Sequence, residues 1–460
     1  MSQLTAVILA AGEGKRMRSR QPKVLHRLCG RPLVAYPVRA ARSVTDQIVM
    51  VVGPEPGDLV PVVGHDVRFA VQRERLGTGH ALLQAEPLCA DGTILVLPGD
   101  TPLLSGATLE RLVTHHRATR AAATLLTAIV DRGHGYGRVL RQGGRVTGIV
   151  EERDATDDQK AITEINTSVY CFEARRLWPA LAKIRTGNAQ GEYYLTDVIA
   201  ILARGGERVE AIATTEVVEA LGVNDRKQLA ALAAILQRRI LDRLMEEGVT
   251  ILDPAATYIE DTVTIGTDTV VYPQVILEGN TVIGSECTVG AGCHIRGSRL
   301  ADRVTLKAYC VIADSVIEDG AIMGPFCHLR PQSHVGPAAH IGNFVELKKS
   351  RIGRGAKANH LAYLGDATVG DDVNVGAGTI TCNYDGVAKY PTTIGDRAFI
   401  GTNASLVAPI TVGAGAYVGA GSVITKDVPP GALAVARGQQ FVKEGWATRR
   451  AQQRPAKREG

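Results

Sequence analysis

The chain has 460 residues, of which 45% are hydrophobic and 22% charged, and its formal net charge at pH 7 is +5. This length is enough for two or three domains that each bury a core, and the composition is ordinary for a soluble globular protein. The first residues carry no basic segment before an apolar core, and no apolar run approaches the length of a membrane span. We therefore expect a cytoplasmic protein without membrane insertion.

The surplus positive charge lies at one end of the chain. From Arg437 onward seven basic residues stand against two acidic ones, and this difference is the whole net charge of +5. The basic tail is either a solvated segment or a segment that closes over an anionic ligand. Aromatic residues make up only 4% of the chain, which argues against a nucleic-acid surface. The eight cysteines form no Cys-x-x-Cys pair, which favours buried free thiols over disulfides or zinc ligands.

The first half alternates short β-branched segments with helical patterns, which predicts a parallel, doubly wound α/β sheet. The expected strands are Ala6–Ala10, Ile48–Val52, Val67–Val71 and Thr93–Leu97, and the expected helices include Leu33–Val44 and Thr108–Thr119. Residues 137–150 are predicted to form an antiparallel hairpin around Gly143-Gly144. Residues 227–247 are predicted to form a linker helix that Gly248 ends, because their leucine and isoleucine residues share one helical face.

From Ile259 to Ile424, long runs of the chain carry an apolar residue at every sixth position, a pattern here called the ladder. The runs are Ile259, Ile265, Val271, Leu277, Ile283, Val289 and Ile295; Ile317, Met323, Leu329, Val335, Ile341 and Leu347; and Ile394, Ile400, Leu406, Val412, Val418 and Ile424. A period of six predicts a parallel β-helix with three hexapeptides in each coil. Gly often follows the apolar residue, as expected where a chain turns tightly. We therefore expect four parts: residues 1–226, a linker at 227–248, a β-helix at 249–436 and a tail at 437–460.

Two turns at the ends of predicted strands are candidates for a ligand site. The first strand continues into residues 9–17, Leu-Ala-Ala-Gly-Glu-Gly-Lys-Arg-Met, which are neither a dinucleotide fingerprint nor a Walker A loop. Backbone N–H groups of this turn could face phosphates beside Arg16 and Lys23, and a plain strand-to-helix turn is the alternative. Asp100 follows another predicted strand at the same sheet edge. Its carboxylate could bind magnesium, or Asp100 could be a simple turn or helix-cap residue.

Six short motifs occur together in the first half. They are Leu9-Ala10-Ala11-Gly12 with Arg16-Met17, Pro22-Lys23-Val24-Leu25, Leu76-Gly77-Thr78-Gly79-His80, Gly99-Asp100, Glu164-Ile165-Asn166-Thr167 and Gly222-Val223-Asn224. With these motifs the first half resembles the sugar nucleotidyltransferases. With the helix and the ladder added, the chain resembles, essentially end to end, the bacterial bifunctional N-acetylglucosamine-1-phosphate uridyltransferases and glucosamine-1-phosphate acetyltransferases.

The resemblance implies a Rossmann-like nucleotidyltransferase domain, a left-handed parallel β-helix and a homotrimer. It implies acetyl transfer from acetyl-CoA to glucosamine-1-phosphate, followed by uridylyl transfer from UTP to N-acetylglucosamine-1-phosphate with release of pyrophosphate. The product would be UDP-N-acetylglucosamine, a precursor for the cell wall and lipopolysaccharide. The implied cofactor is Mg²⁺.

The resemblance also assigns roles to residues of the first half. Nucleotide contacts fall on Leu9, Ala10, Ala11, Gly12, Lys23, Gln72, Gly77 and Thr78, with Gln72 as the reader of uracil and Arg16 adding charge. The acetylated sugar falls to Gly137, Glu151 and Asn166, and magnesium to Asp100 and Asn224. Asn224 could instead be the N-cap of the linker helix. Two departures from the family, Lys15 for a usual Thr and Arg75 for a common Gln, are expected to shift phosphate affinity or base selectivity.

In the ladder, Arg330 and Lys348 are eighteen residues apart and follow apolar positions, where Gly stands elsewhere. Stacked on adjacent coils they would form a phosphate-sized patch, with independent solvated charges as the alternative. The register then slips by one residue, which brings Tyr363 near the same corner. Histidine is the usual general base for deprotonating an amine, and the motif Asn359–Tyr363 favours this catalytic role for His360 over a structural one.

An insertion interrupts the ladder between Thr381 and Ile394, and inserted loops in repeat proteins often carry function. The resemblance adds Asn374 to the glucosamine-1-phosphate site. It assigns acetyl-CoA to Ala377, Asn383, Tyr384, Thr402, Ala420 and Arg437, some of them across a subunit boundary. His328, His334 and His340 are six apart and should lie on three faces of one coil, so we expect no zinc site there.

Two other functions stay open from the sequence. One is a monofunctional sugar-1-phosphate nucleotidyltransferase whose β-helix is structural or regulatory, and His360, the Asn383 loop and the basic tail argue against it. The other is a non-catalytic scaffold or nucleotide sensor. The pairing of Asp100 with Asn224 argues against that second alternative.

Overall fold

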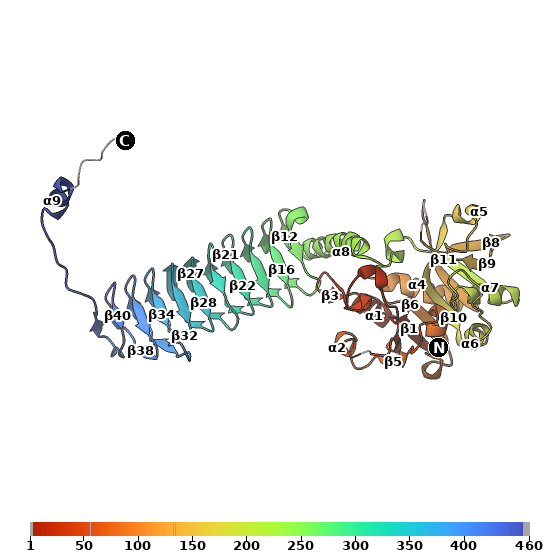
Figure 1. Cartoon of the computed structure of the whole chain (residues 1–460), viewed down its shortest axis with the longest axis horizontal. Helices are drawn as coiled ribbons and strands as arrows, with labels where there is room; N and C mark the ends of the chain where they lie inside the picture. The colour runs from red at the N-terminus through yellow and green to blue at the C-terminus, as the bar shows by residue number, and fades with distance from the viewer. Residues whose placement is uncertain (1–2, 56, 132, 134, 454–460) are drawn as a thin grey trace. The chain divides into compact units, whose positions relative to one another are not determined.

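The computed structural model describes residues 3–55, 57–131, 133 and 135–453 (Figure 1). The chain divides into two compact units, Met1–Ile240 and Leu241–Gly460, and the division falls within helix α8 (Arg226–Glu246). Four charged residues of the predicted tail, Arg454, Lys457, Arg458 and Glu459, lie outside the described residues. Within the described residues, no helix combines the length and apolar character that crossing a membrane requires.

The first unit is built on one mixed sheet with the strand order β11-β7-β10-β6-β1-β4-β5. Its strands are β1 (Leu4–Leu9), β4 (Ile48–Val52), β5 (Arg68–Val71), β6 (Thr93–Pro98), β7 (Ala123–Ile129), β10 (Glu164–Glu173) and β11 (Val209–Ala213). The predicted α/β architecture and all four predicted strands are confirmed. The sheet differs from the prediction in that β10 runs antiparallel to β6 and β7. An antiparallel strand needs no crossover helix, and β10 follows the hairpin of β8 (Arg138–Gln142) and β9 (Arg145–Val150).

Helices cover both faces of this sheet. Every residue of β4 is buried, as expected for a strand packed on both faces. Along β1 the side chains alternate, so Val7 joins one core cluster while Ala6 and Ile8 join the other. The first cluster includes residues of α3 (Thr78–Leu83), α6 (Ala174–Leu181) and α7 (Asp197–Arg204), and the second includes residues of α1 (Ala35–Arg42), α2 (Val60–Val63) and α4 (Gly106–Thr119). The smaller elements are β2 (Arg27–Leu28), β3 (Arg31–Pro32) and α5 (Asp157–Lys160).

Helix α8 confirms the predicted linker helix within one residue at each end. Its predicted apolar face is buried at Leu232, Leu236, Ile240 and Leu244. Gly248 has a φ of 97°, a conformation that other residues rarely adopt, so glycine suits the exit from the helix.

The second unit is a parallel β-helix whose three sheets, here called sheets I, II and III, run along the stack of coils in Figure 1. Residues 17 or 18 apart pair in register, as in Ile352 with Val369 and Val271 with Val289. The apolar residues of the six-residue ladder point inward and are buried. The predicted parallel β-helix of hexapeptide repeats is confirmed.

Sheet I contains β12 (Thr250–Ile251), β15 (Val270–Val271), β18 (Thr288–Val289), β21 (Thr305–Leu306), β24 (Ile322–Met323), β27 (His340–Asn343), β30 (Lys357–His360), β33 (Asn374–Val375), β36 (Phe399–Ile400), β39 (Tyr417–Val418) and β41 (Leu433–Ala434). Sheet II contains β13 (Tyr258–Ile259), β16 (Ile276–Glu278), β19 (His294–Arg296), β22 (Val311–Ala313), β25 (His328–Leu329), β28 (Glu346–Lys348), β31 (Tyr363–Gly365), β34 (Ile380–Cys382), β37 (Ser405–Val407) and β40 (Val423–Ile424). Sheet III contains β14 (Thr264–Ile265), β17 (Val282–Ile283), β20 (Arg299–Leu300), β23 (Val316–Ile317), β26 (His334–Val335), β29 (Arg351–Ile352), β32 (Ala367–Val369), β35 (Thr392–Ile394) and β38 (Ile410–Val412).

The glycines that follow the ladder residues have a different cause from the predicted one. A Cβ atom on Gly290 would lie 2.7 Å from the Leu306 carbonyl oxygen, and one on Gly401 would lie 2.6 Å from the Val418 carbonyl oxygen. Neither glycine has a positive φ, whereas other corner positions with positive φ are held by residues such as Tyr309. Close approach of successive coils, rather than a left-handed turn, therefore requires glycine at these positions.

The same geometry corrects the argument that Arg330 and Lys348 replace corner glycines. The glycine positions lie in sheets I and III. The equivalent column of sheet II contains Glu278, Arg296, Ala313, Arg330 and Lys348 in successive coils. This column has room for side chains, so the two cations are no exception within their own sheet.

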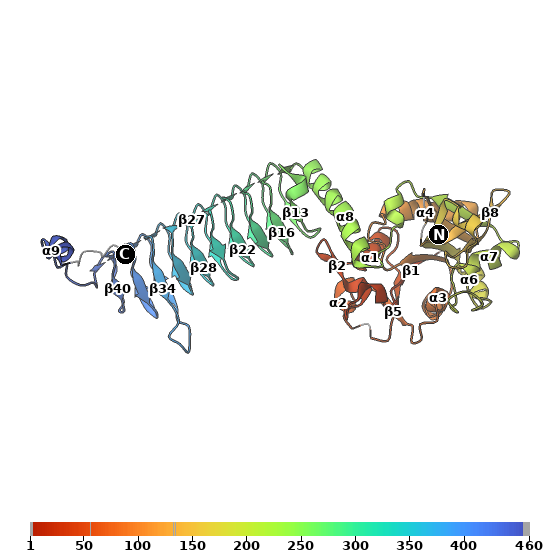
Figure 2. The ribbon, with the colours of Figure 1, turned by 45° about the horizontal axis from the view of Figure 1, so that its top comes forward.

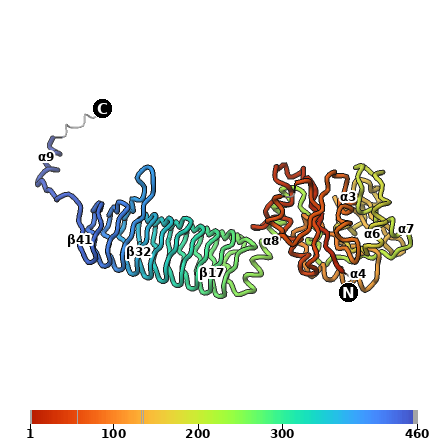
Figure 3. The backbone as a smooth tube through the Cα atoms, turned by 90° about the horizontal axis from the view of Figure 1, so that it is seen from below, coloured from red at the N-terminus to blue at the C-terminus, as the bar shows by residue number. Residues whose placement is uncertain are grey.

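The predicted insertion is confirmed. Val369 pairs with Ile394, so the coil between them is longer than the usual 17 or 18 residues. The extra residues form a loop between β34 and β35 that projects from the side of the β-helix in Figure 2 and Figure 3. Within the part of the chain that the structure describes, seven cysteines are buried, and Cys382, beside this loop, is partly exposed.

Candidate functional site

At the carboxyl edge of the first sheet, the two predicted magnesium ligands each contact a predicted phosphate-binding cation. Lys23 Nζ forms an ion pair with Asp100 Oδ2, with only 14% and 18% of the two side chains exposed. Arg16 Nη2 donates to Asn224 Oδ1 over 2.9 Å. A Cβ on Gly14 would lie 2.5 Å from Lys23 Cβ, so glycine at that position lets Lys23 approach. The Gly-rich turn therefore places Arg16 beside Asn224 and leaves space for Lys23 to reach Asp100.

Asn224 is not the N-cap of α8. Asp225 Oδ1 accepts from the backbone N–H of Gln228 over 2.8 Å, which makes Asp225 the capping residue. The side chain of Asn224 is thereby left for Arg16, and the capping alternative is wrong. The backbone N–H of Val223 donates to the Asp100 carbonyl over 2.9 Å, which ties the Asn224 turn to the Asp100 turn.

The side-chain oxygens of Asp100 and Asn224 at this sheet edge are of the kind that fits a magnesium ion. Carboxylate and amide oxygens are the ligands that a hard cation prefers. The oxygens of Asp100 and Asn224 are each already bonded to a positive group, and their two turns are joined through the backbone.

Apart from Lys23, the predicted nucleotide residues lie in two places: the end of β1 with the Gly-rich loop after it, and the segment from the end of β5 to the start of α3. Leu9 and Ala10 are bound into the sheet, since Gly99 N donates to Leu9 O over 2.9 Å and Ala10 N to Val51 O over 2.8 Å. Gln72, after β5, is buried and donates to the Gly77 carbonyl over 3.2 Å. Its Nε2 also lies 3.1 Å from His80 Nδ1. Ala11 and Gly12 lie on the Gly-rich loop, and Thr78 begins α3 beside Gly77.

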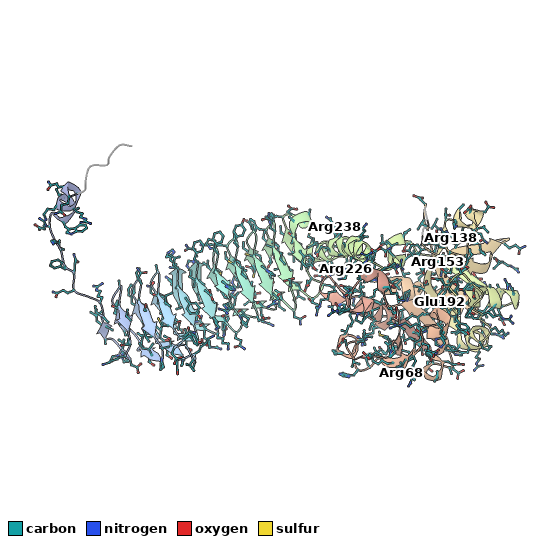
Figure 4. The ribbon with its side chains drawn as sticks, in the orientation of Figure 1. Arg68, Arg138, Arg153, Glu192, Arg226 and Arg238 are labelled. Carbon is teal, nitrogen blue, oxygen red and sulfur yellow. The ribbon has the colours of Figure 1, made fainter. Side chains whose placement is uncertain are left out.

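The structure brings the three predicted sugar residues together. Asn166 N donates to Gly137 O over 2.9 Å, and a Cβ on Gly137 would lie 3.4 Å from Glu151 Oε2. Buried Arg138, labelled in Figure 4, pairs with Glu152 over 2.8 Å and donates to the Tyr136 carbonyl. This arginine secures the turn on both sides of Gly137.

Glu151 has a raised pKa. Burial is the main cause, nearby Asp154 and Asp197 add to it, and the hydrogen bond from Thr196 Oγ1, at 3.1 Å, opposes it. A carboxyl group with this shift retains its proton to higher pH and can bind sugar hydroxyls in either protonation state.

In the β-helix, His360 ends strand β30 on sheet I and is exposed. Its Nδ1 lies 2.7 Å from Asn343 Oδ1 on the preceding coil, with which it pairs in register. Extending the registers of the following coils by two residues places Ala377, Thr402 and Ala420 successively in the same column. Arg437 Nη1 donates to the Ala420 carbonyl over 2.8 Å. Four of the predicted acetyl-CoA residues therefore follow one line along the β-helix from His360.

A cluster of cations lies on sheet II. Arg330 and Lys348 follow the paired residues Leu329 and Leu347, so they lie at the same position on adjacent coils. Arg330 Nη1 pairs with Glu346 Oε1 over 3.1 Å. The pKa of Lys348 is lowered, chiefly by Lys389 from the inserted loop and further by Arg330. A Cβ on Gly365, the register partner of Lys348, would collide with the Tyr363 hydroxyl, so that hydroxyl lies beside the cluster. Three cations and a phenol in one place suit a phosphate group.

The inserted loop contributes two further predicted residues. Asn383 is buried, and its Nδ2 donates to Asp366 Oδ2 over 2.5 Å. Tyr384 is 60% exposed and donates to the Gly386 carbonyl over 2.6 Å. Asn374 lies on β33 of sheet I, away from the Arg330–Lys348 column of sheet II. His328, His334 and His340 lie on sheets II, III and I, so the prediction of three different faces is confirmed.

Sequence reasoning missed several residues that contact the predicted ones, and five of them bear on the argument. They are His80 beside Gln72, Thr196 on Glu151, Asn343 on His360, Asp366 on Asn383, and Lys389 beside Lys348. Asn343 is 17 residues before His360, a spacing that the slipped register could have revealed. Thr196 had no such signal, because its contact depends on the packing of α7 beside β9.

Comparisons with known proteins agree with this geometry. The family model of the MobA-like NTP transferase domain matches residues 6–246, and that of the hexapeptide repeat of succinyl-transferase matches residues 391–426. "Bifunctional protein GlmU" of Brevibacillus brevis is 49% identical over 453 residues, covering 98% of both chains. The chain belongs to the GlmU family.

Two other GlmU proteins show the same end-to-end match. That of Heliobacterium modesticaldum is 49% identical over 98% of this chain and 99% of its own, and that of an Anaeromyxobacter species is 50% identical over 97% and 93%. The predicted function, the paired uridyltransferase and acetyltransferase activities of UDP-N-acetylglucosamine synthesis, is that of the GlmU family and is confirmed. The monofunctional and non-catalytic alternatives are thereby set aside.

Proposed function

We propose that each unit of this GlmU chain carries one of the two reactions: the first transfers a uridylyl group at the Asp100–Asn224 edge, and the second transfers an acetyl group at His360. The observation that supports the first assignment best is the pairing of both predicted metal ligands with cations, Lys23 and Arg16. Acetyl transfer is supported by a histidine held on one ring nitrogen and by the cation cluster one sheet away.

Uridylyl transfer needs positioning and charge neutralisation more than a general base. The attacking phosphate oxygen of N-acetylglucosamine-1-phosphate is already largely ionised near neutral pH. Arg16 and Lys23 bind and neutralise the triphosphate as pyrophosphate leaves. Asp100 and Asn224 would hold Mg²⁺, which when bound supplies further neutralisation of phosphate charge.

The remaining residues of this edge orient the two substrates. Gln72, with its amide held by Gly77, reads the uracil edge, and Gly77 and Thr78 border the nucleotide. Gly137, Glu151 and Asn166 bind the acetylated sugar through its hydroxyl and amide groups. Holding both substrates in this arrangement brings the sugar phosphate to the α-phosphate of UTP.

Acetyl transfer needs the amine of glucosamine-1-phosphate without its extra proton. With Nδ1–H of His360 donated to Asn343, the other ring nitrogen, Nε2, is free to accept that proton. The amine then attacks the thioester carbonyl, and the thiolate of coenzyme A leaves and takes up a proton. Arg330, Lys348, Tyr363 and Lys389 bind the sugar phosphate, with Asn374 on the neighbouring sheet. Ala377, Thr402, Ala420 and Arg437, with Asn383 and Tyr384 of the loop, border acetyl-CoA.

We also propose a cytoplasmic homotrimer. Its support is an exposed aromatic column on the β-helix: Phe326 stacks with Tyr309 and with Phe344 at ring centroid distances of 5.2 Å. These three rings are 46%, 48% and 55% exposed, and a partner copy would cover them. Sedimentation showing a monomer with full acetyltransferase activity would exclude this assembly.

The test of the two reactions uses the whole protein with Mg²⁺ and UTP. One sample receives glucosamine-1-phosphate and acetyl-CoA, and the other receives N-acetylglucosamine-1-phosphate. We expect UDP-N-acetylglucosamine from both samples. Product from the acetylated sugar alone would exclude acetyl transfer, and pyrophosphate release from neither would exclude uridylyl transfer.

A further inference from the structure

Arg75, one of the two departures from the family pattern, lies between the two loops to which nucleotide binding is assigned. The loop after β5, which carries Gln72 and Gly77, is anchored from behind. Tyr193 N donates to Leu76 O over 2.7 Å, Gly79 N donates to Tyr193 O over 2.8 Å, and Leu195 N donates to Thr78 Oγ1 over 3.0 Å. This loop therefore has a fixed position on the first unit.

The Gly-rich loop is more open. A Cβ built on Gly12 would have no atom within 4 Å, so the chain there is not packed against other groups. Arg75 reaches this loop from the anchored one: its Nε donates to the Ala11 carbonyl over 3.0 Å, and its Nη1 pairs with Glu13 Oε1. The guanidinium thus holds both the backbone and a side chain of the open loop.

Charges and space around Arg75 favour the same contact. Glu13 Oε2 also pairs with Lys15 Nζ over 3.0 Å, and Lys15 and then Arg75 lower the pKa of this carboxyl group, so it stays ionised. Gly53, after β4, leaves space for the guanidinium, because a Cβ there would lie 3.4 Å from Arg75 Nη2. Lys15, the other departure, belongs to the same charged group.

We propose that Arg75 is a positioning residue for UTP, a brace that fixes the gap between the Ala11–Glu13 loop and the anchored Gln72–Gly77 loop. This inference rests on the proposed uridylyl transfer at this edge. If the loop is already ordered, UTP binding does not have to include the entropy cost of ordering it. The brace therefore lowers the KM for UTP. A fixed gap also favours the small uracil ring over a purine.

The main variant is Arg75→Gln, which has no charge and a shorter side chain, and so loses the guanidinium that spans the Ala11 carbonyl and Glu13. We expect the KM for UTP to rise about tenfold with kcat nearly unchanged, as for a loss of preorganised binding. The ratio of kcat/KM for ATP to that for UTP should rise, whereas the KM for N-acetylglucosamine-1-phosphate should stay constant. Acetyl transfer by the same chain is the internal control for folding.

Three further variants separate the parts of the brace. Glu13→Gln retains the Ala11 bond and should have a smaller effect, and Arg75→Lys should lie between wild type and Arg75→Gln. In the double variant, Glu13→Gln should add little to Arg75→Gln, because both substitutions remove the same ion pair between Arg75 and Glu13. Arg73→Gln, at an exposed arginine of the same loop, is the matched control for charge and should leave the KM for UTP unchanged.

Four results would overturn the brace: an unchanged KM for UTP in Arg75→Gln, an equal rise for UTP and the sugar phosphate, an equal effect of Arg73→Gln, or additive effects of Glu13→Gln and Arg75→Gln. A wild-type chain that releases no pyrophosphate from UTP would overturn the proposed function and the brace together. Wild-type activity with an unaltered Arg75→Gln enzyme would overturn the brace alone.

Discussion

The two units assemble their sites in different ways. In the first unit, the Arg16–Asn224 contact joins residues 208 apart in sequence, and Lys23–Asp100 joins residues 77 apart. In the β-helix, His360 and Asn343 are 17 apart, and Arg330 and Glu346 are 16 apart. The sheet edge brings distant loops together, whereas the β-helix places side chains by the spacing of its coils. If the two sites are independent, damage to one should leave the other active.

The largest effect is expected from His360→Ala. Without the proposed base, acetyl transfer should fall about 10²- to 10⁴-fold, whereas pyrophosphate release from UTP should continue. Thiol release from acetyl-CoA and pyrophosphate release are measured on the same preparation. His328→Ala, at an exposed histidine on sheet II, is the control. Near-normal acetyl transfer in His360→Ala would show that another group removes the proton.

Asp100→Ala should produce the converse result. Loss of this carboxylate should lower UTP-dependent pyrophosphate release about 10²- to 10³-fold, the effect of losing one preorganised electrostatic group, and thiol release should persist. Asp100→Asn, which keeps the shape, separates charge from packing. Loss of both activities in a folded variant would contradict separate sites.

Asn343→Ala tests whether the contact between neighbouring coils orients His360, the proposed base. Removing the hydrogen-bond partner of a metal-bound histidine costs about 10- to 100-fold, and we expect acetyl transfer to fall by a similar factor here, and by less than in His360→Ala. The pH profile of acetyl transfer should shift as well, since the bond to Nδ1 stabilises one tautomer. A lowered rate with an unchanged profile would assign Asn343 a packing role only.

Acid stability tests the first unit separately. His116 is buried, and burial lowers its pKa to about 4, with Arg117 and His115 adding to the shift. Below about pH 6.5 this histidine is protonated in the unfolded chain but still neutral in the folded chain. Its contribution to the free energy of unfolding is therefore fully present above that pH and is lost as pH falls toward 4. The full loss is about 3 kcal/mol. His116→Gln should flatten this part of the urea-unfolding free energy against pH, and an unchanged slope would assign the acid sensitivity to other groups.

The smallest effect is expected from Lys389→Met. The KM for glucosamine-1-phosphate should rise roughly tenfold, because one charge-assisted hydrogen bond to phosphate is lost. The pKa of Lys348 should move up toward its ordinary value, since Lys389 is the main cause of its lowering. The Tm should not fall, because a repulsion is removed. Lys426→Met, at an exposed lysine elsewhere on the β-helix, is the control, and an equal rise in KM there would exclude a specific role for Lys389.

Much of the fold follows from the sequence, because its signals are local. The six-residue period reflects inward side chains in every coil, so Ile259 and Leu277 reveal the β-helix without any knowledge of their partners. In the same way Ile48–Val52 predicts a buried strand to the residue. β10 was not among the predicted strands, and its antiparallel direction could not be foreseen, because strand composition does not record which neighbour a strand pairs with.

The candidate sites were less predictable, for reasons that individual residues show. Asn224 had two local interpretations, and only the capping bond of Asp225 and the contact from Arg16 distinguish them. Glycine at the corners suggested tight turns, but the close backbone of the next coil is the physical cause. The family resemblance supplied most of the residues with proposed roles. Residue type and spacing alone allowed more than one physical explanation for each of them.

By itself, the sequence determined the apolar period, the βαβ rhythm and the motifs that place the chain in its family, because each depends on neighbouring residues along the chain. Only the tertiary structure decided that Lys389 lies beside Lys348, that Asn343 holds His360, and that Arg75 reaches Ala11 and Glu13. These contacts join segments that meet only after sheets and coils have formed. A side chain's partner is set by that packing, which no local pattern encodes.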